Sequence, residues 1–133
     1  MNFSNKDQII NASAEKVFRL CSNCQNLISY MPPQVTDFKS TEDSCSFTVS
    51  NMFQVTLSIT EKVEFEKIVY VASNDKNIPL SLTFFLKDIH PCQTSMSVEV
   101  EMDVPIFLRS MVKDPINNVL QMLTSKIKME AEK

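Results

Sequence analysis

The chain has 133 residues, of which 44% are hydrophobic and 22% charged, and its formal net charge is −3. This length predicts one domain covering residues 1–133, and the negative charge without a basic patch argues against nucleic acid as a partner. The sequence contains no glycine, which excludes glycine-rich phosphate and dinucleotide loops and the G-x-S-x-G nucleophile elbow.

The first part of the chain predicts a strand and two short helices. The strand covers residues 3–10, after which Ser13 can cap a helix. A second helix, at residues 25–30, stops before Met31-Pro32-Pro33, because the residue before a proline disfavours helical geometry. The side chains expected to point inward from the first helix are Val17, Phe18 and Cys21.

From residue 34 the hydrophobic period changes to two, which is typical of half-buried strands. Successive strands are predicted at residues 35–39, 45–49, 53–59, 67–73, 80–86 and 96–102, with a turn at 89–92. Turns that need a positive φ must use residues other than glycine, and Asn51, Asn74 and Asn77 lie where the alternation breaks. Short-looped strands in succession predict an antiparallel sheet with one apolar face.

A long helix is predicted at residues 116–130. Asp114 can cap it, and Pro115 suits its first turn, where a missing N–H costs nothing. The residues that recur on one helical face are Ile116, Val119, Leu120, Leu123 and Ile127. This face must cover the apolar side of the sheet, so the residues predict an α+β fold.

The segment Ile10–Phe18, which reads I-N-A-S-A-E-K-V-F, resembles the opening I-x-A-x-x-E-x-V-F/W of the START-like superfamily, also called SRPBCC. Asn26 through Pro32 is similar to that family's short second helix and following proline. The resemblance covers the whole chain. It implies the helix-grip fold: a curved antiparallel sheet of about six to seven strands wrapped around a long C-terminal helix, with two short helices after the first strand.

Members of this superfamily enclose an apolar cavity, and they include lipid carriers, plant hormone binders and polyketide cyclases or dehydratases. The chain lacks the glycine-rich loop of the plant allergen branch and has Phe18 where many members have tryptophan. The ligands of those branches are therefore not carried over. The sequence is most similar to the short bacterial members.

Two groups of residues are candidates for chemistry. Cys21 and Cys24, with His90 and Cys92, offer four possible zinc ligands, but one C-x-x-C without a second pair is a weak signal. His90, the sole histidine, could be oriented by Asp88, although an exposed turn residue is the simpler interpretation. We expect reduced, packed cysteines, no catalytic residue, no metal and no cofactor. With no membrane-span pattern and no signal-peptide core, a cytoplasmic location is expected.

The inferred function is binding of a small hydrophobic molecule, lipid-like or polyketide-like, between the sheet and the long helix. An entrance is expected near Met31-Pro32-Pro33, the adjoining strand loops and residues 108–112. Tyr70 could hydrogen-bond a ligand head group if it points inward. The expected lining residues are Leu27, Met31, Phe47, Tyr70, Phe84, Met96, Val98, Leu108, Met111, Val112 and Val119.

Two alternatives remain open. One is an enzyme of the polyketide cyclase or dehydratase type that uses the same cavity, and the other is a structural or partner-binding module with a filled interior. An inward-pointing ionisable pair would favour the enzyme. A homodimer is also possible.

Overall fold

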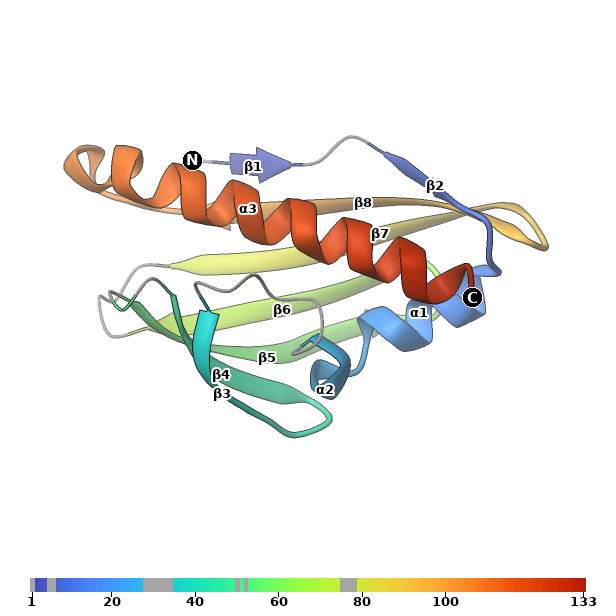
Figure 1. Ribbon diagram of the computed structural model, residues 1–133, viewed down its shortest axis with the longest axis horizontal. Coiled ribbons are helices and arrows are strands. Elements are labelled where there is room, and N and C mark those ends of the chain that lie inside the picture. The colour runs from blue at the N-terminus through green and yellow to red at the C-terminus, as the bar shows by residue number, and fades with distance from the viewer. Residues whose placement is uncertain (1, 5–6, 28–34, 50, 52, 75–78) are drawn as a thin grey trace.

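The computed structural model describes residues 2–4, 7–27, 35–49, 51, 53–74 and 79–133. Strands and helices follow one another in the predicted order (Figure 1). The elements are β1 (Asn2–Ser4), β2 (Gln8–Ile10), α1 (Ala14–Cys21), α2 (Cys24–Leu27), β3 (Val35–Ser40), β4 (Ser44–Val49), β5 (Phe53–Val63), β6 (Lys67–Asn74), β7 (Leu80–His90), β8 (Gln93–Met102) and α3 (Ile106–Ala131).

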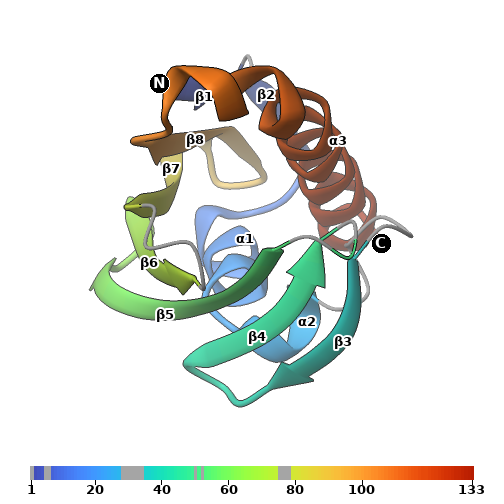
Figure 2. The same ribbon diagram turned by 90° about the vertical axis from the view of Figure 1, so that its left-hand side faces the viewer.

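All strand pairs are antiparallel, and the sheet has the order β1-β8-β7-β6-β5-β4-β3. Because β2 also pairs with β8, the eight described strand segments occupy seven positions in the sheet. Figures 1 and 2 show the sheet curving around an interior, with α3 along one side and the short helices α1 and α2 at one end. This is the predicted α+β helix-grip architecture.

The start of α1 follows the sequence pattern. The Ser13 hydroxyl accepts a hydrogen bond from the Lys16 N–H at 3.2 Å and thereby caps the helix. Val17, Phe18 and Cys21 are buried, as the helical spacing predicts. The end of α1 that carries Cys21 thus closes one end of the sheet.

The start of α3 differs from the prediction. The helix has 26 residues and begins at Ile106, with Pro105 at its N-cap and no side-chain cap. The predicted cap residue, Asp114, therefore lies inside the helix. Pro115 lacks only the N–H that would bond the Met111 carbonyl, so it removes one hydrogen bond and favours a kink without ending the helix. In Figure 2 the orange first turns of α3 cross the top of the molecule, whereas the red remainder descends one side.

Backbone conformations at the turns are partly as predicted. Asn51 has φ 56°, but Asn74 lies within β6, and Asn77 falls outside the described residues. Positive φ values also occur at Asp37 (55°) and Phe65 (66°), which the sequence did not indicate. The predicted turn at 89–92 is shorter, because β7 continues through His90.

Candidate ligand-binding site

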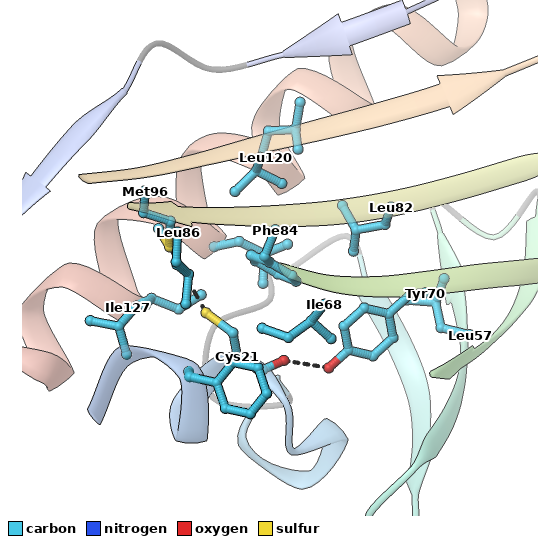
Figure 3. Packing of buried hydrophobic residues seen from close by; sticks show 14 of the residues in the cluster. Cys21, Leu57, Ile68, Tyr70, Leu82, Phe84, Leu86, Met96, Leu120 and Ile127 are labelled. Carbon is cyan, nitrogen blue, oxygen red and sulfur yellow. Dashed lines mark hydrogen bonds between the residues drawn. The ribbon is translucent and has the colours of Figure 1, made fainter. Parts of the chain in front are cut away.

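The interior is solid at the end closed by α1. Here the inward side chains of the central strands and of the second half of α3 are buried, and many of them have 0% exposure, so no space for water adjoins those side chains. Figure 3 shows several of these side chains packed between the sheet, α1 and α3. The fully buried residues of this closed end are Val17, Cys21, Ile68, Tyr70, Phe84, Met96, Val98, Leu123 and Ile127.

Polar groups at the closed end have partners within the protein. The Tyr70 hydroxyl donates to the backbone carbonyl of Cys21 (Figure 3), and the Thr94 hydroxyl donates to the Ala12 carbonyl at 2.9 Å. Tyr70 does point inward, but its proton already satisfies a carbonyl at the end of α1. A buried carbonyl left without a donor is costly, so this hydrogen bond fixes α1 against β6.

The opposite end of the interior is more open. Along the inner face of β8, exposure rises from 0% at Val98 to 6% at Val100, and Met102 is only half-buried. On β6 it rises from 0% at Tyr70 to 8% at Ala72. The inner face of the sheet is therefore fully covered near α1 and becomes partly exposed at Leu80 and Met102, at the other end.

A groove of about 550 Å³ lies at this open end, where β6 ends, β7 begins and β8 ends. The Asp103 N–H donates to the Pro79 carbonyl at 3.0 Å and holds the adjoining strand ends together. The lining surface is about as polar as it is apolar, because five apolar residues are joined by Ser81 and by two carboxylates, Glu101 and Asp103. The described lining consists of Val71, Ala72, Pro79, Leu80, Ser81, Glu101, Met102 and Asp103.

The residues predicted to line the site are divided between several environments. Phe47, Tyr70, Phe84, Met96 and Val98 are buried, Val119 is half-buried on α3, and Met111 is exposed. Leu27, Leu108 and Val112 lie in helices, but the structure does not describe their side chains, and Met31 with the predicted entrance at 31–33 lies outside the described residues.

Among the predicted residues whose side chains the structure describes, none borders the groove, and the groove residues Ala72, Leu80 and Met102 were not among those predicted. All three lie on the inner face of the sheet, two or more residues farther toward the open end of their strands than the residues predicted from the sequence. Their position near the ends of the predicted strands was the feature of the sequence that could have identified them as groove residues.

The candidates for zinc binding and catalysis are also dispersed. Cys21 is in the core with its Sγ 3.9 Å from Met96 Sδ, and burial raises the pKa of this thiol far above its ordinary value. Cys92 is exposed near the β7–β8 turn, and His90 is exposed at the end of β7. Among the described residues, no three histidine, cysteine or acidic side chains lie close enough together to hold a metal ion.

Searches with the sequence alone matched no family model and no curated protein. Solved structures, in contrast, match over nearly the whole chain. They include a START superfamily protein of Mycobacterium smegmatis, with 16% identity over 98% of this chain and 97% of that one and a TM-score of 0.73. The chain has a helix-grip fold of the START type.

Two further solved structures support this assignment. The Zhui aromatase/cyclase of Streptomyces sp. R1128 has a TM-score of 0.81 and 11% identity over 99% of this chain and 93% of that one. A protein of Chromobacterium violaceum has a TM-score of 0.76 and 14% identity over 100% of this chain and 99% of that one. At such low identity the likeness establishes the fold. In the part of the chain that the structure describes, no helix is both long and apolar enough to cross a membrane.

Proposed function

We propose that the chain, acting as one domain, binds a small, mainly apolar molecule at the open end of its interior. The observation that carries this proposal is the change along the inner face of β8 from full burial at Met96 and Val98 to half-burial at Met102. A ligand seated there would cover the partly exposed apolar side chains that adjoin the groove. Covering them removes apolar surface from water, which favours binding.

The groove's size supports a ligand of ordinary metabolite dimensions. Its volume of about 550 Å³ lies in the usual range for small-molecule sites, roughly 300–1,000 Å³. A lipid-like or polyketide-like compound would fit this lining, and a cytoplasmic carrier would use it.

The described interior favours binding over catalysis. Among the described residues, the buried polar side chains besides Tyr70 are Thr94 and Thr124, and no charged side chain is buried. Both threonine hydroxyls donate to backbone carbonyls. An acid–base enzyme would need an ionisable group within reach of its substrate. The described ionisable groups next to the groove are the carboxylates of Glu101 and Asp103, and both are exposed to water, so neither is held in a buried position suited to proton transfer.

A thermal-shift screen tests the proposal with fatty acids, sterols, flavonoids and quinones. A compound present at about 100 times its Kd stabilises the folded state by about 2.7 kcal/mol. For a domain of this size, that corresponds to a rise in Tm of roughly 10 °C. Native mass spectrometry of the freshly purified protein would identify a ligand that co-purifies.

A matched pair of variants locates the ligand. Ala72→Phe places a large side chain in the groove, whereas Ser97→Phe places the same side chain on the outer face of β8 between Met96 and Val98, away from the groove. Ala72→Phe should abolish the ligand-induced shift, and Ser97→Phe should retain it. If no apolar compound shifts the Tm, or if Ala72→Phe binds as the unmodified protein does, the proposed function is wrong.

A further inference from the structure

The first part of α3, Ile106–Asp114, here called the α3 arm, exposes large apolar side chains. Ile106 is 80% exposed, Phe107 76% and Met111 47%. Phe107 and Met111 are four residues apart, which places them on the same face of the helix. Three large apolar side chains exposed within two helical turns are unusual for a protein surface that contacts only water.

The position of the arm makes it accessible to a large partner. Pro105 joins the arm to Val104, which is 3% exposed, and the Arg109 Nε donates to the Val104 carbonyl at 3.4 Å. The arm is therefore anchored where it leaves the sheet, next to groove residues Met102 and Asp103. Beyond this anchor, Figure 2 shows it crossing the top of the molecule at the edge of the fold.

The charge of the arm is opposite to that of the chain. It carries two exposed cations, Arg109 and Lys113, and one carboxylate, Asp114, in a protein whose formal net charge is −3. None of the ion pairs among the described residues involves Arg109 or Lys113. A net cationic segment with exposed apolar side chains suits a partner that is both apolar and negatively charged.

The exposed area argues against a second copy of the chain as that partner. Three side chains of this size present on the order of 400 Å² of apolar surface. A stable protein interface buries about 800 Å² on each partner. A membrane surface needs no such matched area, because a short amphipathic helix can insert its apolar side chains at the headgroup boundary while cations contact anionic lipids.

We propose that the α3 arm docks on a membrane surface that contains anionic lipids. The arm lies in the plane of the interface with Phe107 and Met111 toward the acyl chains and Arg109 and Lys113 toward lipid phosphates. Backbone groups within a helix are mostly hydrogen-bonded to one another, which makes a helix suitable for this environment. The inference stands on the arm alone and holds whether or not the groove binds a ligand.

Vesicle flotation with the full chain tests this inference. The probes are vesicles of pure phosphatidylcholine and vesicles with 30 mol% phosphatidylglycerol. We expect at least fivefold more protein bound to the anionic vesicles. Phe107→Asp should reduce that binding at least fivefold, whereas Ile89→Asp, which changes an exposed isoleucine at the far end of β7, should leave it unchanged (Figure 1).

A charge variant with both Arg109→Gln and Lys113→Gln gives a second test that involves no apolar residue. It should remove the preference for anionic vesicles and keep the Tm. Equal binding to both vesicle types, absence of binding, or full binding by Phe107→Asp would overturn the inference. Sedimentation equilibrium is run on the same samples, and a dimer that Phe107→Asp dissociates would identify a second copy as the occupant and also overturn it.

Discussion

A pair of leucine substitutions tests whether the interior is solid at one end and open at the other. Leu120 is 1% exposed and lies among fully buried neighbours (Figure 3). Because such neighbours cannot relax into the space left behind, Leu120→Ala should cost about 3–5 kcal/mol, the upper part of the range for buried leucines. Leu80 is half-buried at the groove, so Leu80→Ala loses only part of its transfer free energy, about 1 kcal/mol.

Urea unfolding followed by circular dichroism measures both costs, and an unchanged m-value shows that the unfolded states are comparable. In thermal unfolding, Leu120→Ala should lower Tm by roughly 12–20 °C and Leu80→Ala by about 4 °C. The two variants delete the same atoms, so the difference reports the environment alone. If Leu120→Ala costs no more than Leu80→Ala, the division of the interior into a packed and an open end is wrong.

Three other predictions concern local features. The pKa of the Glu132 carboxyl is lowered mainly by hydrogen bonds from the Asn11 backbone N–H and from Lys128. The stability that the ionised carboxylate contributes is therefore present above its unfolded-state pKa and is lost as pH falls. Glu132→Gln should therefore destabilise the protein at neutral pH, and urea titrations should show the difference fading below about pH 4. Phe65 has φ 66°, so Phe65→Gly should be more stable than Phe65→Ala by about 1 kcal/mol, the reverse of the usual order. Peptide mapping after treatment of native protein with iodoacetamide should find Cys92 alkylated and Cys21 unmodified, because only the former is exposed and burial suppresses the Cys21 thiolate.

The alternation of apolar residues was sufficient to predict the sheet. In β8, for example, Met96 and Val98 point inward, whereas Ser97 and Glu99 point outward. One face of the sheet must be buried, and a shift by one residue would expose that entire face, so the pattern fixes which side chains are inside. The same reasoning failed for α3, because Pro115 is equally compatible with the first turn of a helix and with a kink inside a longer one.

The candidate site was harder to predict for a physical reason. Met96 and Met102 share a strand and a face, yet Met96 is fully buried and Met102 borders the groove. Periodicity identifies the face of a side chain but not how completely its neighbours fill the space above it. That filling depends on where α1 lies, since Cys21 and Val17 from this helix pack the closed end. Only the three-dimensional arrangement distinguishes the two methionines.

The most direct test of the proposed ligand site is a methyl NMR titration of protein labelled with ¹³C at the methionine methyl groups. The probes are the fatty acids, sterols, flavonoids and quinones of the thermal-shift screen, and Met→Leu variants assign the Met96 and Met102 signals. We predict that a binding compound shifts the Met102 methyl signal saturably and leaves the Met96 signal in place. A saturable shift at Met96 without one at Met102, or no shift at Met102 with any probe, would contradict a ligand site at the open end of the interior.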